Sequence, residues 1–278
     1  MTVRDVLRAA TEYLERKGVE SPRVDAELLL AHALGLSRIQ LYTEHDRPLT
    51  ESERAGARTL VERRGRREPL AYVLGEWGFR RLTLATDARA LVPRPETEVV
   101  VERCLALLED IEAPRVVDVG TGTGAIALSL AQERPDASVW ATDSSADALA
   151  LARSNGERLR LAVELREGDL LAGLQGAFDL VVCNPPYVLA AELDELQPEL
   201  LAEPRAALVD EGQTESLARA ARDVLDGWLV LEVHERRAQD IGALAESLGY
   251  DVVRISADLA GRERVVEARW QRATSNGR

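Results

Sequence analysis

Apolar residues near the start of the chain recur at the spacing of a helix. Val3, Val6, Leu7, Ala10 and Leu14 fall on one helical face, and a glycine follows as a stop signal. Similar patterns, bounded by capping residues, prolines and glycines, predict further helices within residues 22–36, 51–67 and 67–75. We therefore expect residues 1–75 to form a small all-helical domain.

The pattern changes after this segment, where short apolar runs replace the helical spacing. Residues 76–95 are predicted to form a β-hairpin or an extended connector. Over residues 96–278, apolar strands alternate with helical segments, which predicts a parallel sheet covered by helices on both faces. The expected strands are residues 115–120, 138–143, 161–169, 178–184, 227–234, 250–256 and 264–270.

The last two expected strands are joined by a loop too short for a crossover helix, so they should pair antiparallel. The predicted fold class is therefore α/β, with an N-terminal helical domain. Seven strands ending in an antiparallel pair resemble the sheet of Rossmann-like, class I methyltransferases that use S-adenosylmethionine.

Charge and cysteine content narrow the possible partners. The net charge is −13, whereas a nucleic-acid-binding protein usually presents a basic face, so we expect no direct nucleic-acid binding. The dense basic cluster at residues 63–68 is interpreted as a solvated helix end. Cys104 and Cys183 lie far apart, which favours the reducing cytoplasm over a disulfide framework. No apolar run reaches membrane-spanning length.

The stretch VVDVGTGTGAIALSLA predicts a ligand-binding loop between a strand and a helix. Gly120, Gly122 and Gly124 allow a tight turn and a close approach of backbone to ligand. Asp143 ends the next strand about 20 residues later, where a carboxylate can bind ribose hydroxyls. The spacing also satisfies the dinucleotide fingerprint, so this loop alone leaves NAD open as the cofactor.

Two further acids lie close to this loop in the predicted sheet. Asp118 precedes the glycines, and it either faces the ligand or organises the loop by accepting its N–H groups. Asp169, at the end of the third strand, either lies near an adenine or is a solvated turn residue.

The stretch VVCNPPY ends the fourth strand abruptly, because neither proline has a backbone N–H to donate to a ladder. Its location places Asn184 to Tyr187 outside the carboxyl ends of the strands, in the same crevice as the glycine loop. The motif resembles that of methyltransferases acting on planar nitrogen: adenine N6, cytosine N4 or the glutamine amide.

The residue types suit that chemistry. An amide nitrogen is a poor nucleophile, because its lone pair is delocalised into the carbonyl. The Asn184 side-chain oxygen and the Pro185 carbonyl can accept hydrogen bonds from an NH2 group and stabilise the charge growing on its nitrogen. Pro186 helps to hold that carbonyl, and Tyr187 can pack over the planar group. The proton can leave after transfer, so no neighbouring base is required.

Over nearly its whole length the chain resembles the HemK-type release factor glutamine methyltransferases. The resemblance rests on the stretches RVDAELLLAHALG, RREPLAYVLGEWGF, LVPRPETEVVVE, DVGTGTGAIALSLA, NPPY, EPRAALV and DLAGRERVV. It implies methylation of N5 of the glutamine in the Gly-Gly-Gln loop of peptide chain release factors, with S-adenosylmethionine becoming S-adenosylhomocysteine. By the same resemblance the cofactor would be contacted by Gly120, Thr121, Gly122, Thr123, Gly124, Asp143 and Asn184, and the glutamine by Asn184, Pro185, Pro186 and Tyr187.

The chain departs from the family pattern after Asp169. Leu170 stands where relatives often place an aromatic residue against the adenine, so either Leu170 or another residue packs there.

The stretch LVPRPETE offers two interpretations. Pro95 suits the first turn of a helix, and the acids suit its N-terminal dipole. Alternatively, Arg94 and Glu96 line the substrate pocket. The histidines are scattered along the chain, and we expect no metal site.

Other functions remain to be separated from this one. They are glutamine methylation of a ribosomal protein, adenine N6 methylation of nucleic acid, and a binding protein that uses the cofactor pocket structurally. We expect a monomer whose helical domain docks the protein substrate, since one glutamine side chain offers little specificity.

Overall fold

The computed structural model describes residues 1–258 and 260–272, which form two compact units. The first unit comprises Met1–Glu76 together with Leu196–Ala202, and the second comprises Trp77–Glu195 and the chain from Glu203 onward. Each unit has hydrophobic cores of its own. In the part of the chain described, no helix combines the length and apolar character needed to cross a membrane.

The first unit is helical, as predicted. Its helices are α1 (Val3–Arg16), α2 (Pro22–Leu34), α3 (Arg38–Thr43), α4 (Glu51–Gly65) and α5 (Leu70–Leu74). Thr2, Ser37 and Thr50 begin α1, α3 and α4 with complete capping boxes, each satisfying backbone N–H groups that a helix start leaves unpaired. Helix α3 was not anticipated, because six residues are too few for a clear apolar period.

The basic cluster at residues 63–68 is not the solvated helix end that was predicted. Arg64 is buried, and its Nε lies 2.7 Å from Oδ2 of Asp25. Arg64 and Arg67 both bind Glu199, with nitrogen–oxygen distances of 2.7 and 2.6 Å. Glu199 belongs to Leu196–Ala202, so a segment far along the chain neutralises the end of α4.

The second unit begins with the predicted hairpin and continues into the predicted sheet. Strands β1 (Glu76–Phe79) and β2 (Leu82–Ala85) form a two-stranded sheet. The seven-stranded sheet has the order β5-β4-β3-β6-β7-β9-β8. Its strands are β3 (Arg115–Val119), β4 (Ser138–Asp143), β5 (Glu164–Glu167), β6 (Phe178–Cys183), β7 (Leu225–Glu232), β8 (Val252–Ala257) and β9 (Glu263–Trp270).

Pairing within this sheet confirms the expected arrangement. Strands β3 to β7 pair in parallel, whereas β9 pairs antiparallel with both β7 and β8. Strand β5 is shorter than predicted, because it is an exposed edge strand. The carboxyl ends of β3, β4 and β6 therefore meet at one edge, where a ligand site is expected.

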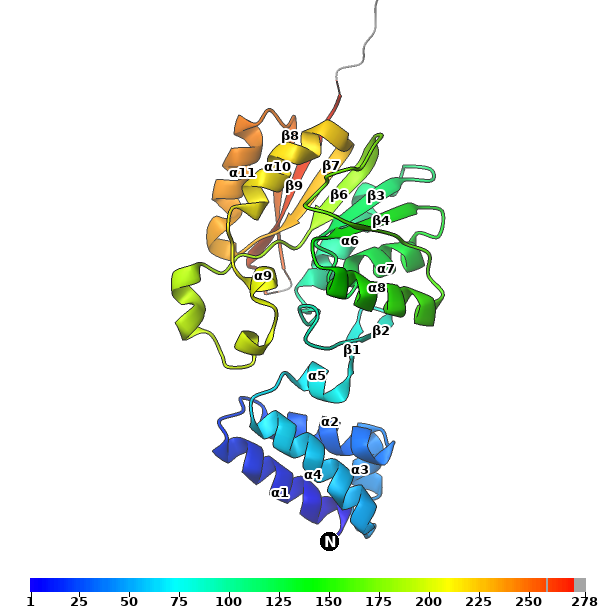
Figure 1. Cartoon of the computed structure of the whole chain (residues 1–278), viewed down its shortest axis with the longest axis vertical. Coiled ribbons are helices and arrows are strands. Elements are labelled where there is room, and N and C mark those ends of the chain that lie inside the picture. The colour runs from blue at the N-terminus through cyan, green and yellow to red at the C-terminus, as the bar shows by residue number, and fades with distance from the viewer. Residues whose placement is uncertain (259, 273–278) are drawn as a thin grey trace, which may run out of the picture. The chain divides into compact units, whose positions relative to one another are not determined.

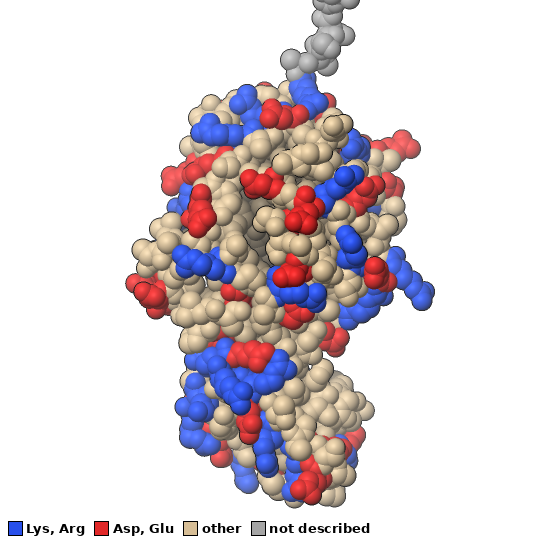
Figure 2. Space-filling view, in the orientation of Figure 1, with Lys and Arg blue, Asp and Glu red and all other residues tan. Residues whose placement is uncertain are grey.

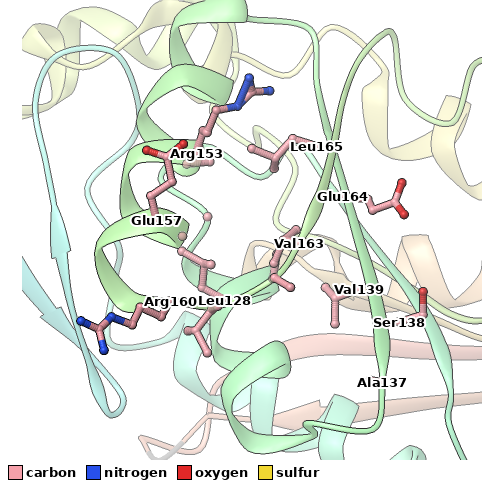
Figure 3. Close-up of a pocket in the computed structure, with 16 residues that line it drawn as sticks. Leu128, Ala137, Ser138, Val139, Arg153, Glu157, Arg160, Val163, Glu164 and Leu165 are labelled. Carbon is pink, nitrogen blue, oxygen red and sulfur yellow. The ribbon is translucent and has the colours of Figure 1, made fainter.

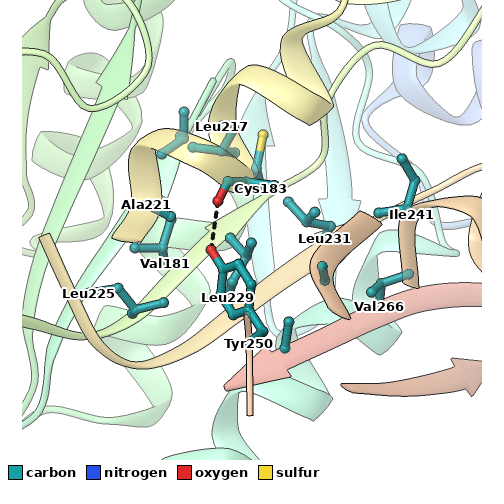
Figure 4. Close-up of a cluster of buried hydrophobic side chains, with 14 of the residues drawn as sticks. Val181, Cys183, Leu217, Ala221, Leu225, Leu229, Leu231, Ile241, Tyr250 and Val266 are labelled. Atoms are coloured by element: carbon teal, nitrogen blue, oxygen red, sulfur yellow. Dashed lines mark hydrogen bonds between the residues drawn. The ribbon is translucent and has the colours of Figure 1, made fainter. Parts of the chain in front are cut away.

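Helices cover both faces of the sheet (Figure 1). Successive strand residues point to opposite faces, so Val116 packs with α6 (Thr97–Leu107) and α7 (Ala125–Glu133), and Val117 packs on the other face. Figure 4 shows that other face, where Leu217 and Ala221 of α10 (Gln213–Val224) meet strand residues. The remaining helices are α8 (Ala146–Leu159), α9 (Arg205–Leu208), α11 (Ala238–Ser247) and the 3-10 helices η1 (Ala190–Glu195), η2 (Leu200–Ala202) and η3 (Glu235–Arg237).

Candidate active site

The glycine loop joins β3 to α7 through three left-handed residues. Gly120, Gly122 and Gly124 have φ values of +69°, +57° and +85°, which side chains with a Cβ rarely adopt. The N–H groups of Gly120 and Thr121 donate to the Thr142 carbonyl at 2.8 and 3.0 Å. The loop is therefore held against the end of β4, with its backbone open to a ligand.

Asp143 holds two elements at the end of β4. Its Oδ2 accepts from the Gly122 N–H at 2.9 Å, and its Oδ1 accepts from the Ser145 N–H at 2.9 Å. Ser145 in turn caps α8 by accepting from Ala148. One carboxylate thus fixes the glycine loop and the start of α8, and its remaining lone pairs stay available to ribose hydroxyls.

Asp118 lies beneath the loop rather than in front of it. Its Oδ2 accepts from the Thr121 hydroxyl at 2.6 Å and from the Ala127 N–H at 3.2 Å, while Oδ1 is buried without a hydrogen-bond partner among the described residues. Burial raises the pKa of this carboxyl to about 7, although both hydrogen bonds oppose the shift. These contacts favour the interpretation that Asp118 organises the loop.

The glycine loop and the Asn-Pro-Pro motif open into one cleft of about 430 Å³. Eight predicted site residues line it: Gly120, Gly122, Asp143, Asp169, Leu170, Asn184, Pro185 and Pro186. Among the described residues, the lining does not include Asp118, Thr121, Thr123, Gly124, Tyr187, Arg94 or Glu96. The sheet edge has therefore brought the two motifs together, as the strand order requires.

Leu170 reaches the cleft through an unusual backbone conformation. Its φ is +51°, and its carbonyl accepts from the Thr142 hydroxyl at 2.8 Å. This hydrogen bond ties the end of β4 to the turn that carries Asp169 and Leu170. An aliphatic side chain thereby lines the cleft.

A larger cavity of about 590 Å³ lies elsewhere in the second unit (Figure 3). Aliphatic side chains such as Leu128, Val139 and Val163 line it, together with Arg153 and Glu157 of α8. It contains no part of the Asn-Pro-Pro-Tyr motif and neither of the cleft's aspartates. The smaller cleft, which contains both motifs, is therefore the candidate active site.

Asn184 directly follows β6, with its side chain held from one side. Its Nδ2 donates to Oγ1 of Thr97 at 3.1 Å. Thr97 is the first residue of α6 and is buried. Because the amide N–H group points to Thr97, the Oδ1 atom is free to accept from another group.

The rest of the motif is anchored by its neighbours. The Tyr187 ring lies 6.0 Å from the His234 ring, centroid to centroid, with an interplanar angle of 53°. Burial raises the pKa of Tyr187, and the negative charge of Glu232 adds to the shift. Val188 exchanges backbone hydrogen bonds with Leu208 and Asp210, both at 2.9 Å. The loop after the motif is thus fastened to α9.

Arg94 and Glu96 are engaged in ion pairs. Arg94 binds the buried carboxylate of Glu203, which also accepts from the Val92 N–H at 2.9 Å. Glu96 pairs with Arg262 at 3.4 Å. Helix α6 begins only at Thr97, so Pro95 precedes the cap instead of lying in the first helical turn as predicted.

Three residues of this region were missed in the sequence: Thr97, Glu203 and Glu232. Glu203 lies in the EPRAALV stretch, which carried part of the family resemblance, so a signal for it existed. Thr97 lies at the start of an expected helix, and Glu232 lies within the strand expected at residues 227–234. Nothing in their local pattern indicates that they lie beside the motif.

Comparison with solved structures agrees with this fold. The hMettl16 catalytic domain superimposes with a TM-score of 0.54 at 15% identity, covering 69% of this chain and 76% of that one. The T. Thermophilus 16S rRNA N2 G1207 methyltransferase superimposes with a TM-score of 0.52 at 17% identity, covering 71% of this chain and 50% of that one. The strand order and the helix layers are those of the Rossmann-like class I methyltransferase fold.

Sequence comparison identifies the family. Residues 5–75 match the PrmC N-terminal domain, and residues 100–226 match the methyltransferase small domain. The release factor glutamine methyltransferase of Deinococcus radiodurans is 45% identical, covering 97% of this chain and 99% of its own. Those of Rhodopirellula baltica and Geobacter sulfurreducens are 40% and 41% identical over at least 95% of both chains. The chain belongs to the release factor glutamine methyltransferase family.

The family and the fold imply the use of S-adenosylmethionine, and the cleft fits that group. Gly120 has open space where a Cβ would stand, so its backbone can approach a ligand closely. Asp143 offers carboxylate oxygens for ribose hydroxyls, and Leu170 offers apolar surface for a purine. These donors, acceptors and apolar contacts match the parts of the molecule.

Proposed function

We propose that this protein transfers the methyl group of S-adenosylmethionine to N5 of the glutamine in the Gly-Gly-Gln loop of peptide chain release factors. The observation that carries the proposal is the placement of Asn184. Its amide, held by Thr97, opens into the same cleft as the glycine loop, and the chain belongs to a family named for this reaction. The product is S-adenosylhomocysteine.

The acceptor side of the reaction depends on Asn184, Pro185 and Tyr187. The Asn184 Oδ1 atom and the Pro185 carbonyl accept from the two N–H groups of the glutamine amide. These contacts direct the nitrogen and stabilise its developing positive charge. Pro186 restricts the backbone that carries the Pro185 carbonyl, and Tyr187 packs over the planar amide. Arg94 and Glu96 do not line the cleft themselves, and their proposed part is to support the substrate side from behind through their ion pairs with Glu203 and Arg262.

The donor side depends on the glycine loop. S-adenosylmethionine supplies an electrophilic methyl group on a positively charged sulfur. The backbone of Gly120 to Gly124 holds it, with Thr121 and Thr123 shaping the loop and Asp118 bracing it from beneath. Asp143 binds the ribose, Asp169 and Leu170 border the adenine, and Asn184 lies where the two sides meet.

Replacing Asp143 by alanine is expected to raise the Kd for S-adenosylmethionine by about tenfold to a hundredfold, since charged hydrogen bonds contribute about 1.5–3 kcal/mol. Two loop contacts and the ribose acceptors are lost together. Titration calorimetry measures the change. Asp147→Ala is the control, because Asp147 is an exposed acid in the first turn of α8. An unchanged Kd in folded Asp143→Ala protein would exclude the ribose role.

The helical unit is proposed to dock the release factor, and the enzyme to act as a monomer in the cytoplasm, where both buried thiols stay reduced. A single glutamine side chain offers few contacts, so specificity requires a second surface. Direct nucleic-acid binding is not part of the proposal. On the face shown in Figure 2, acidic and basic side chains are intermixed over the second unit, and the net charge is −13.

Labelled S-adenosylmethionine tests the substrate directly. The protein is incubated separately with full-length release factor, a peptide of the Gly-Gly-Gln loop, ribosomal protein and duplex DNA. We expect label on the release factor glutamine and none after that glutamine is changed to alanine. The isolated peptide should show a KM at least about tenfold higher, because it lacks the docking surface. Label confined to ribosomal protein or DNA would overturn the proposal.

A further inference from the structure

A buried glutamate lies beside the acceptor motif. Glu232 is the last residue of β7, and the parallel register pairs Cys183 with Leu231, so Asn184 and Glu232 follow at the same sheet edge. Glu232 is 1% exposed, and its Oε2 atom has no hydrogen-bond partner among the described residues. Burying a carboxyl group with an unpaired oxygen is costly, which calls for a function.

Thr97 stands between Glu232 and Asn184. Its Oγ1 atom accepts from the Asn184 Nδ2 group at 3.1 Å. The Thr97 hydroxyl also lies close enough to the Glu232 carboxyl to lower the pKa of that group. Strand β7, helix α6 and the loop after β6 thus bring three polar side chains together, and two of them, Thr97 and Glu232, are buried.

We propose that Glu232 is a positioning residue that acts through Thr97 to fix the orientation of the Asn184 amide. The inference rests on the proposed function, in which the Asn184 Oδ1 atom accepts from the substrate NH2 group. Glu232 itself touches neither substrate nor cofactor in this arrangement.

Thr97 alone cannot choose between the two orientations of the amide. A hydroxyl group can accept from Nδ2 or donate to Oδ1, and the two orientations of an asparagine amide have almost the same shape. An ionised carboxylate removes this freedom, because it can only accept. With its proton given to Glu232, Thr97 must accept from Asn184, and Oδ1 then faces the substrate.

The charge state of Glu232 depends on groups from several elements. Burial raises its pKa to about 7, opposed by the nearby Thr97 hydroxyl and by the positive charges of Arg264 on β9 and Arg94. Glu96, at the start of α6, raises the pKa further, and the charge of Glu232 in turn raises the pKa of Tyr187. Below about pH 7 the Glu232 carboxyl is protonated and no longer forces Thr97 to donate. The Asn184 orientation that turns Oδ1 toward the substrate then becomes less populated.

The test is the pH dependence of methyl transfer to full-length release factor. We expect wild-type kcat to fall as pH decreases through about 7. Glu232→Gln should lower kcat about tenfold at pH 8 and lose this pH dependence, while the KM for S-adenosylmethionine changes less than about twofold. Thr97→Val should cause a similar loss, and Thr97→Ser, which keeps the hydroxyl, should restore most of the rate.

A double variant tests whether Glu232 and Thr97 act as one relay, in which Glu232 affects Asn184 only through Thr97, or have two independent effects. Glu232→Gln combined with Thr97→Val should be no slower than Thr97→Val alone, because both changes break the same chain of contacts. A Glu232→Gln loss that persists in full on the Thr97→Val background would overturn the relay. Ser256→Ala is the matched control. It removes a hydroxyl on β8 that donates to the buried carboxylate of Glu267 on β9 at 3.1 Å. Its kcat should equal that of the wild type.

Stability distinguishes positioning from structural support. A carboxyl whose pKa is raised on folding, here from 4.5 to about 7, loses stabilisation as pH rises through that range. Glu232→Gln should therefore unfold at a higher temperature than wild type at pH 8, although its methyl transfer is slower.

If Glu232→Gln keeps the wild-type rate and pH profile while Asn184→Ala is inactive, the relay is wrong and the proposed function stands. If Asn184→Ala is also fully active, the proposed function itself fails.

Discussion

Asn184→Ala should reduce kcat for release factor methylation about a thousandfold while leaving the protein folded, since removing one preorganised polar contact in an active site costs about 10² to 10³ in rate. The substitution removes the Oδ1 acceptor for the substrate amide, and with it the group that stabilises charge on the nitrogen. Asn184 follows β6, and its side chain makes one hydrogen bond among the described residues, to Thr97, so the sheet should be little affected.

Single-turnover transfer with saturating S-adenosylmethionine measures this effect apart from cofactor binding. Circular dichroism and thermal unfolding establish that the variant is folded, and calorimetry should give a Kd for S-adenosylmethionine within about tenfold of wild type. Near-normal single-turnover rates in a folded Asn184→Ala enzyme would remove Asn184 from the mechanism.

Gly227→Ala should produce a large loss of stability, about 3 kcal/mol, because overpacking against backbone cannot be relieved by a rotamer change. A Cβ at Gly227 would lie 2.0 Å from the Asp179 carbonyl oxygen and 2.7 Å from its carbonyl carbon. Asp179 lies where the β6–β7 pairing shifts register, between Phe178 and Leu180. The added methyl group would therefore force apart two central strands.

Urea denaturation measures this loss as a lower midpoint at an unchanged slope. Gly78→Ala is the matched control, because Gly78 also lies in a strand but has no atom within 4 Å of the added Cβ. Its stability should change by less than about 1 kcal/mol. Equal midpoints for Gly227→Ala and wild type would show that the two strands can separate at little cost.

The sequence predicted the elements that depend on local chemistry. Helix starts were recognisable because capping residues such as Thr50 act within one turn, and their capping boxes are present. The sheet was recognisable because buried parallel strands are continuous apolar runs. The glycine loop and the Asn-Pro-Pro motif could be placed together because both follow strands, and parallel strands end at one edge.

Predictions were weaker for side chains whose partners are distant in the sequence and are brought close only by folding. The arginines at the end of α4 looked solvated, yet Glu199 from a distant segment neutralises two of them. Asp118 could have faced the ligand, and only its contacts with Thr121 and Ala127 favour the bracing role.

By itself, the sequence determined the fold class, the family and the two loops that form the cleft, because periodicity, turn chemistry and contiguous motifs are local properties. Only the tertiary structure decided what supports those loops. Glu203 reaches Arg94 from 109 residues away, and Thr97 reaches Asn184 from 87 residues away. Such contacts depend on strand order and on the start of α6, and a buried polar side chain takes its role from the groups that folding brings beside it.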